Sequence, residues 1–328
     1  MTGMNILVVG GAGYIGSHMV KLLGERRCAV TTLDDLSSGH RDAVLTGDFV
    51  QGDMADTELL RSLFARRKYD AVMHFASFIE VGESVREPAK YYRNNVANTL
   101  TLLAAMREAG IDRFIFSSTA AIFGTPQYSP IDERHPRAPI NPYGRTKNMV
   151  EDVLGDYERA YGLRSVCLRY FNAAGADPDG KLGERHDPES HLIPLALQAA
   201  SGRRAGLSVY GTDYDTPDGT CIRDYVHVSD LCEAHWLALE SLRDGASSQA
   251  YNLGNGNGFS VLEVIETAKK VTGVDFAVKH EARRAGDPPR LVADASAIKA
   301  KLGWLPRYAD LDTIIAHAWA FERSRKPS

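Results

Sequence analysis

The stretch from residue 4 to residue 34 constrains the fold of this chain more than any other. An apolar run of strand length, residues 4–9, passes into a glycine-rich turn, and a helical run then leads to a second strand-like run that ends on Asp34. A glycine turn between a strand and a helix lets the backbone approach a pyrophosphate at the helix N-terminus. The sequence therefore predicts a dinucleotide-binding site, although its glycines, Gly10, Gly13 and Gly16, follow the spacing GxxGxxG rather than GxGxxG.

The acidic pair at the end of the second strand indicates which dinucleotide is bound. Asp34 stands where a carboxylate accepts hydrogen bonds from the adenosine ribose, and Asp34 together with Asp35 would repel a 2′-phosphate. We therefore expect the cofactor to be NAD rather than NADP.

The composition excludes several classes of protein. A formal net charge of −4 offers no basic face, so we expect neither a nucleic-acid partner nor a membrane partner. The four cysteines are scattered without a CxxC pair, which is typical of reduced thiols in the cytosol. The strand expected at Met4 leaves no room for a signal peptide, and no apolar run approaches the length of a membrane span. These features predict a soluble, cytoplasmic protein.

Strand-like and helical runs alternate up to Asn172, and this alternation predicts the architecture. It is typical of βαβ units and hence of an α/β, Rossmann-type, doubly wound parallel sheet. Beyond Asn172 the alternation breaks, and we expect a smaller α+β C-terminal lobe. We predict an NAD-binding domain over 1–175, with a returning segment near 220–245, and a substrate-binding domain over 176–328.

Tyr143 and Lys147 are the strongest candidates for chemistry. They stand four residues apart at the start of a helix expected to run from Pro142 to about Tyr161, so their side chains share one face. A nearby ammonium stabilises tyrosinate and lowers the pKa of a phenol, which would make Tyr143 a general base beside Thr119 at the end of the preceding strand. The alternative is a chance Tyr-x-x-x-Lys on a solvated helix face.

The chain resembles the extended short-chain dehydrogenase/reductases, and within them the UDP-glucose 4-epimerases, over nearly its whole length. In the first lobe the resemblance is carried by GGAGYIGSH (10–18), HFA (74–76), VGESV (81–85), FSST (116–119), NPYGRTK (141–147) and LRYFNAAG (168–175). In the second lobe it rests on DGTCIRDYVHV (218–228), YNLG (251–254) and RRAGD (283–287), which belong to the nucleotide-sugar side of these enzymes.

The resemblance implies a redox-neutral reaction on a UDP-hexose. Tyr143 would remove the proton of the sugar 4-hydroxyl while the C4 hydride passes to NAD, and Thr119 would share the hydrogen bond to that oxygen. Lys147 would hold the nicotinamide ribose and lower the pKa of Tyr143. The transient 4-keto sugar would then turn and take the hydride back on its other face, which interconverts UDP-galactose and UDP-glucose.

The same resemblance extends the set of expected binding residues. The residues expected to bind the cofactor, including those of the glycine turn and the acidic pair, are Gly10, Gly13, Tyr14, Ile15, Gly16, Asp34, Asp35, Asp53, Met54, Phe75, Ala76, Asn94, Lys147 and Tyr170. On the substrate side we expect Thr119, Tyr143, Asn172, His191, Leu192, Tyr210, Arg223, Arg284, Asp287 and Leu291, with the two arginines clamping the diphosphate.

Two departures from the family pattern bear on the function. Ile79 stands where well-known epimerases carry a lysine, which removes one positive contact to the cofactor. Leu291 occupies the position that gates sugar size and is intermediate, so a UDP-N-acetylglucosamine 4-epimerase or a dual-specificity epimerase stays open. Ala120-Ala121 offers no acid or base for a dehydratase or decarboxylase, and the presence of Tyr143 disfavours a non-catalytic NAD sensor.

Two further expectations concern a loop and an interface. The side chains of His186, Asp187, Glu189 and His191 resemble metal ligands, but a flexible loop favours a solvated polar turn, and we expect no metal. In the related enzymes two long helices pair across a dimer as a four-helix bundle; here these would be 88–109 and 142–161, and we expect a homodimer.

Overall fold

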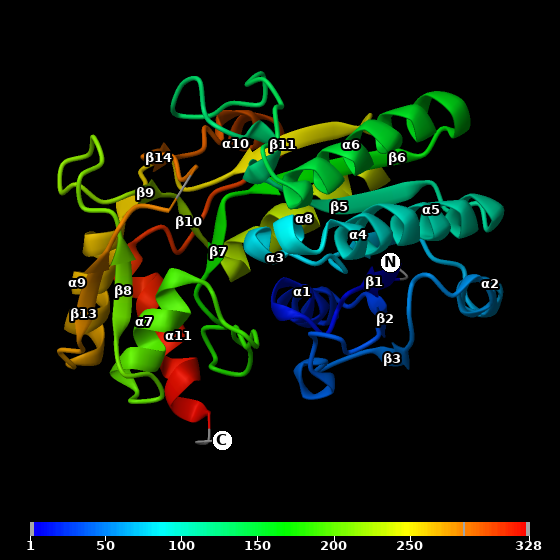
Figure 1. Ribbon diagram of the computed structural model, residues 1–328. Coiled ribbons are helices and arrows are strands. Elements are labelled where there is room, and N and C mark those ends of the chain that lie inside the picture. The colour runs from blue at the N-terminus through cyan, green and yellow to red at the C-terminus, as the bar shows by residue number, and fades with distance from the viewer. Residues whose placement is uncertain (1–2, 285, 326–328) are drawn as a thin grey trace.

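The computed structural model describes residues 3–284 and 286–325. Its centre is one parallel sheet of seven strands in the order β11-β6-β5-β4-β1-β2-β3 (Figure 1). The Rossmann-type sheet predicted from the sequence is confirmed. The strands are β1 (Asn5–Val9), β2 (Ala29–Asp34), β3 (Asp48–Gln51), β4 (Ala71–His74), β5 (Arg113–Thr119), β6 (Arg164–Tyr170) and β11 (Gln249–Leu253).

The edge strand β11 was not predicted. It pairs in parallel with β6, with Leu253 beside Tyr170, although it lies near the middle of the segment expected to form the second lobe. The preceding helix α8 (Val228–Arg243) returns to the sheet as predicted. The part of the chain that completes the sheet therefore extends past the returning segment expected near 220–245.

The two faces of the sheet carry separate apolar cores. Because side chains alternate along a strand, Ile6 and Val8 of β1 pack into the core under α1 (Tyr14–Glu25) and α8, while Leu7 and Val9 face the other core. That second core lies under α2 (Thr57–Arg66), α5 (Thr99–Glu108) and α6 (Pro142–Tyr161). Both faces are thus covered, as in a doubly wound fold.

The long helix expected over 88–109 has an irregular middle. After the short helix α3 (Val81–Arg86), the chain forms α4 (Pro88–Tyr91), a π-helical segment (Tyr92–Asn98) and α5. The wider turn places Asn95 inside, where its amide nitrogen donates to Phe78 O at 3.0 Å and to Thr146 Oγ1 at 3.1 Å. Helical periodicity does not reveal such a bulge, which recurs at functional sites.

The second lobe packs three helices against short strands, on the left in Figure 1. Its helices are α7 (Leu192–Ala200), α9 (Val261–Thr272) and α11 (Leu311–Ser324), with β8 (Leu207–Tyr210) paired to β13 (Val278–Glu281). The remaining elements are β7 (Asn172–Ala174), β10 (Tyr225–His227), β9 (Ile222–Arg223), β12 (Phe259–Ser260), β14 (Arg290–Leu291), α10 (Ser296–Leu302) and the 3-10 turns Arg41–Ala43 and Ala120–Phe123.

In the part of the chain that the structure describes, no helix combines the length and the apolar character that crossing a membrane requires.

Candidate active site

The glycine turn after β1 is closed by backbone contacts that exclude side chains. Gly10 has φ of +80° and its N–H donates to Leu33 O at 2.8 Å. A Cβ on Gly16 would lie 2.1 Å from Gly10 O, and one on Gly10 would lie 2.5 Å from Ala76 N. The turn therefore needs glycine at positions 10 and 16, and Gly13 within it is the N-cap of α1.

Asp34 organises this turn as well as ending β2. Its Oδ2 accepts from Ala12 N–H at 2.8 Å and its Oδ1 accepts from Leu36 N–H at 2.9 Å. Burial raises the pKa of the carboxyl, and these two hydrogen bonds oppose that shift. The sequence pattern located Asp34 but did not predict that it ties the glycine turn to the loop after β2.

A cleft of about 530 Å³, open to solvent, runs along the carboxyl ends of β1, β2, β3 and β4. This is the edge at which doubly wound folds bind their ligands. Nine of the expected cofactor residues line the cleft: Gly10, Gly13, Asp34, Asp35, Asp53, Met54, Phe75, Ala76 and Asn94. Ser77 of the loop after β4 also lines it. Ser37, Ser38, Gly39 and Phe78 line it too and were not predicted, although they lie in the loops after β2 and β4.

The other expected cofactor residues surround this cleft. Tyr14 lines an adjoining small cleft and donates its hydroxyl to Gly175 O at 2.7 Å. Gly16 lies beneath Gly10, and Ile15 packs partly against the core under α1. Tyr170 ends β6, where burial raises the pKa of its phenol.

Thr119, Tyr143 and Lys147 meet where β5 ends and α6 begins. Asn141 caps α6 by accepting from Gly144 N–H at 2.8 Å, which fixes the first turn that carries Tyr143. The buried Lys147 amine donates to Ser117 O at 2.7 Å and to Ser77 Oγ at 2.8 Å. Since Ser77 lines the cleft, the Lys147 amine lies directly beside it.

The pKa of Tyr143 moves opposite to the expectation. Burial raises the pKa of Tyr143 to about 12, and only a hydrogen bond with Thr119 acts to lower it. Burial also lowers the pKa of Lys147 to about 7, which weakens its ammonium form. Lys147 contributes no lowering of the pKa of Tyr143 here, and its amine donates to Ser77 and Ser117 instead.

The expected substrate residues of the second lobe pair with one another. Arg223 of β9 forms an ion pair with Asp287, and the Arg284 guanidinium lies 4.0 Å from the centre of the Tyr210 ring. Asn172 Nδ2 donates to Asp224 O at 2.9 Å, beside β9. Two arginines and their partners therefore lie in one region, although they come from distant parts of the sequence.

Leu291 joins this region to the catalytic residues. It stands in β14, in register with Arg223 of β9. Its side chain packs against a buried cluster that includes Ala120, Ile122 and Phe123, the turn directly after Thr119. This contact places Leu291 beside the turn that follows Thr119.

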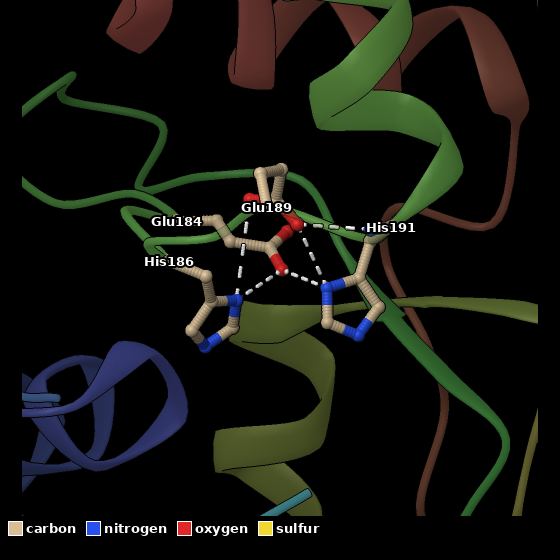
Figure 2. A group of neighbouring side chains, drawn as sticks. All are labelled: Glu184, His186, Glu189 and His191. Carbon is tan, nitrogen blue, oxygen red and sulfur yellow. Dashed lines mark hydrogen bonds and ion pairs between the residues drawn. The ribbon is translucent and has the colours of Figure 1, made fainter. Parts of the chain in front are cut away.

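The turn expected to be solvated around His191 is a compact cluster instead (Figure 2). His186 and His191 direct Nδ1 toward Glu184, at 2.9 and 2.8 Å, and the carboxylate side chains of Glu184 and Glu189 are only 6% and 5% exposed. The prediction of a solvated turn was wrong for Glu189, because the loop folds over its carboxylate, whereas Asp187 is exposed. Asp187 is not part of the cluster, and Glu184 was not predicted.

Comparison with known proteins defines the class to which this site belongs. The model of the NAD dependent epimerase/dehydratase family matches residues 6–254, and the chain belongs to that family. It is 52% identical to a UDP-glucose 4-epimerase of Rhizobium meliloti, over 99% of this chain and 99% of the relative.

Solved structures agree with this assignment over the full chain. The UDP-glucose 4-epimerase from Brucella ovis in complex with NAD superposes with a TM-score of 0.95 at 53% identity, covering 98% of this chain and 99% of that one. The UDP-Glc/GlcNAc 4-epimerase from Campylobacter jejuni superposes with a TM-score of 0.87 at 46% identity, covering 98% and 100%.

Proposed function

We propose that this protein is a UDP-glucose 4-epimerase, which interconverts UDP-galactose and UDP-glucose through a transient 4-keto sugar with bound NAD. The observation that carries the proposal is that Tyr143, hydrogen-bonded with Thr119, and Lys147, whose amine donates to Ser77 of the cleft, share the start of α6. The full-length similarity to UDP-glucose 4-epimerases supports the same reaction.

The cleft fits NAD in shape and in charge. Its glycine turn has no room for side chains where a pyrophosphate would approach the start of α1, and Asp34 and Asp35 are placed to favour ribose hydroxyls over a phosphate. Lys147, beside Ser77, would hold the nicotinamide ribose. Bound NAD supplies a reversible hydride acceptor.

Proton transfer falls to Tyr143. Its phenol, hydrogen-bonded with Thr119, would take the proton of the sugar 4-hydroxyl and later return it. Because burial holds the pKa of Tyr143 at about 12 here, tyrosinate has to be stabilised by additional positive charge in the working site. Thr119, at the end of β5, would keep the sugar oxygen within reach during both half-reactions.

UDP binding falls to the second lobe. Arg223 and Arg284 would clamp the diphosphate, and Tyr210, Asp287, Asn172, His191 and Leu192 would contact the remaining nucleotide. A firm grip on the nucleotide leaves the sugar free to turn over Tyr143. We further propose that residues 176–328, apart from α8 and β11, form the nucleotide-sugar domain.

An NMR assay tests the proposal directly. Purified protein without added NAD is given UDP-galactose, and UDP-glucose is followed; wild type should convert it, and Tyr143→Phe should lose at least a thousandfold in rate. Tyr161→Phe, at the exposed end of the same helix, is the matched control and should keep full activity. Conversion by Tyr143→Phe at the wild-type rate, or none by wild type even with NAD⁺ supplied, would refute the proposal.

Turnover of N-acetylated sugars is the second candidate function. Leu291 is smaller than the tyrosine that restricts this position, and the chain is similar over its full length to the UDP-Glc/GlcNAc 4-epimerase from Campylobacter jejuni. The same assay with UDP-N-acetylglucosamine tests it, and a wild-type rate for this substrate near that for UDP-galactose would establish dual specificity.

We also propose a cytoplasmic homodimer joined through α5 and α6. Leu100 and Met149 are 37% and 44% exposed on these helices, whereas Leu103 and Leu154 face the chain's own core. The four cysteines are free thiols, in keeping with a reducing compartment. Light scattering should give a dimeric mass at micromolar concentration, and Leu100→Glu with Met149→Glu should give a monomer.

A further inference from the structure

The loop between β7 and α7 gathers four metal-ligating side chains. One ligand atom from each of Glu184, His186, Glu189 and His191 lies within 4.8 Å of all the others. Glu184 Oε1 is 2.9 Å from His186 Nδ1 and 2.8 Å from His191 Nδ1, and Glu189 Oε1 is 3.0 Å from His191 Nδ1 (Figure 2). The nitrogens and carboxylate oxygens therefore converge on one point.

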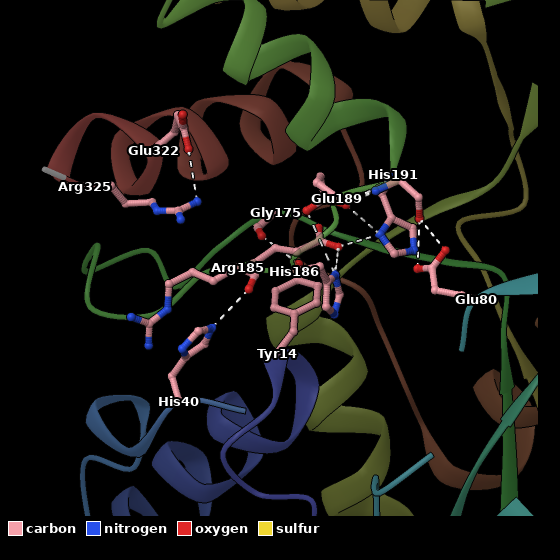
Figure 3. Close-up of polar contacts among 12 residues, drawn as sticks. Tyr14, His40, Glu80, Gly175, Arg185, His186, Glu189, His191, Glu322 and Arg325 are labelled. Atoms are coloured by element: carbon pink, nitrogen blue, oxygen red, sulfur yellow. Dashed lines mark hydrogen bonds and ion pairs between the residues drawn. The ribbon is translucent and has the colours of Figure 1, made fainter. Parts of the chain in front are cut away.

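Among the described residues, no lysine or arginine forms an ion pair with the two carboxylates of this cluster. Glu184 and Glu189 are almost fully buried, yet among the ion pairs of the described residues they pair only with the two histidines. The nearby guanidinium groups are engaged elsewhere: Arg185 pairs with Asp42, and Arg325 pairs with Glu322, as Figure 3 shows for the second pair. Two buried carboxylates without a lysine or arginine are costly unless a cation or a proton joins them.

We propose that Glu184, His186, Glu189 and His191 bind a divalent transition-metal cation, with zinc preferred. Two imidazole nitrogens and two carboxylates form a mixed N/O donor set that suits Zn²⁺. Ligands about 2 Å from a tetrahedral ion lie roughly 3.3 Å from one another, which falls within the 2.8–4.0 Å range of the ion pairs in the cluster. The cation takes the place of the protons on the two Nδ1 atoms, and the two carboxylates cancel its charge.

Contacts around the cluster hold the ligands in place. Glu189 Oε1 accepts from Ser190 N–H at 2.8 Å and from His191 N–H at 2.9 Å, which fixes this carboxylate. The Tyr14 ring packs edge-on to His186, with 6.3 Å between ring centres. The imidazoles of His186 and His191 are 20% and 39% exposed, so an ion has a route from solvent.

The position of the cluster indicates a structural rather than a reactive metal. Four protein ligands close a tetrahedral shell, leaving no open position for substrate on the ion. His191 faces the cluster through Nδ1, which leaves its Nε2 for the nucleotide contact proposed above. The same loop contacts the segment after β2 through His40, whose Nε2 lies 3.0 Å from Arg185 O. It also contacts the segment after β4 through Ser190 Oγ, which donates to Glu80 Oε1 at 2.9 Å (Figure 3). The cation would fix this loop between the two lobes.

Metal binding by tag-free protein tests the proposal. After removal of metals with a chelator, Zn²⁺ is titrated in competition with a chromophoric chelator, and one equivalent per chain should bind with a dissociation constant below a micromolar. Co²⁺ should give the visible absorption of a tetrahedral N/O site. No stoichiometric Zn²⁺ in wild type, or a cobalt spectrum of octahedral solvent-bound ion, would overturn the proposal.

Variants locate the ion. His186→Asn and Glu189→Gln should each weaken Zn²⁺ binding at least a hundredfold, whereas His280→Asn, which removes an exposed histidine of β13, should bind like wild type. The NAD content and circular dichroism of each variant establish that it is folded. Binding that survives both cluster variants, or is lost in His280→Asn, places the ion elsewhere and refutes the site; an anomalous signal in crystals of the wild type gives the same decision without any variant.

Discussion

The proposed cofactor cleft and the proposed substrate region of this protein are built in different ways. The cleft is made mainly of backbone and short side chains at the ends of neighbouring strands. In its glycine turn, a Cβ added to Gly10 or Gly16 would lie closer to backbone atoms than van der Waals contact allows. The substrate region depends on long charged side chains, such as Arg223 and Asp287, that meet from distant segments. A single substitution in a site built from backbone should therefore cause a large loss of binding, whereas one in a site built from side chains should cause a smaller loss.

Gly16→Ala should have the largest effect. Its Cβ would lie 2.1 Å from Gly10 O, so the turn must open, and NAD retained by the purified protein should fall more than tenfold. Gly155→Ala is the matched control, because a Cβ there meets only the far end of Arg159 at 3.5 Å. Chromatography of the nucleotide released on denaturation measures both, and equal NAD content in the two variants would contradict a backbone-built cleft.

Lys147, beside the proposed cofactor cleft, gives a pH-dependent test of how strongly that region is buried. Its folded pKa of about 7 lies below the unfolded value of about 10.5, so the unfolded state binds more protons between these values and stability rises with pH in that window. From pH 7 to pH 9, the unfolding free energy of NAD-free protein should rise about 2 kcal/mol more in wild type than in Lys147→Met. Urea titrations of both proteins at the two pH values measure this, and parallel pH profiles would show that Lys147 is not desolvated.

Arg223→Lys should have a moderate effect confined to the substrate. Lysine keeps the charge but loses the planar guanidinium that binds two phosphate oxygens, so UDP should bind about tenfold more weakly, near 1.4 kcal/mol. Arg134→Lys, 91% exposed and paired with Asp132, is the control. Calorimetry measures UDP binding, and the NAD content of each protein reports on the cleft. A loss of NAD in Arg223→Lys would contradict an effect confined to the substrate region.

Leu291→Tyr should have the smallest effect on the main reaction. The larger ring would narrow the space beside Ala120 and Ile122, and it should lower the rate ratio of UDP-N-acetylglucosamine to UDP-glucose severalfold. Unfolding midpoints verify that the core there tolerates the ring. An unchanged ratio in a folded variant would remove Leu291 from the determinants of sugar size.

Sequence reasoning succeeded where local patterns determine structure. The alternation of strands and helices predicted the sheet, and the glycine spacing with Asp34 predicted which strand ends line the cleft. It failed where packing decides. The pKa of Tyr143 depends on burial, which the spacing to Lys147 does not report, and the cluster at Glu184 depends on how one loop folds over itself. The π-helical segment is likewise hidden within a helical pattern.

The late edge strand β11 has a consequence for how the chain is made. β6 obtains its outer neighbour only from residues 249–253, after the ribosome has produced nearly half of the segment 176–328. Until then a nascent chain exposes an unpaired strand edge, which is a template for association with other chains. A chain released just before Gln249 should therefore aggregate rather than persist as a small nucleotide-binding protein, and the two lobes should unfold as one cooperative unit.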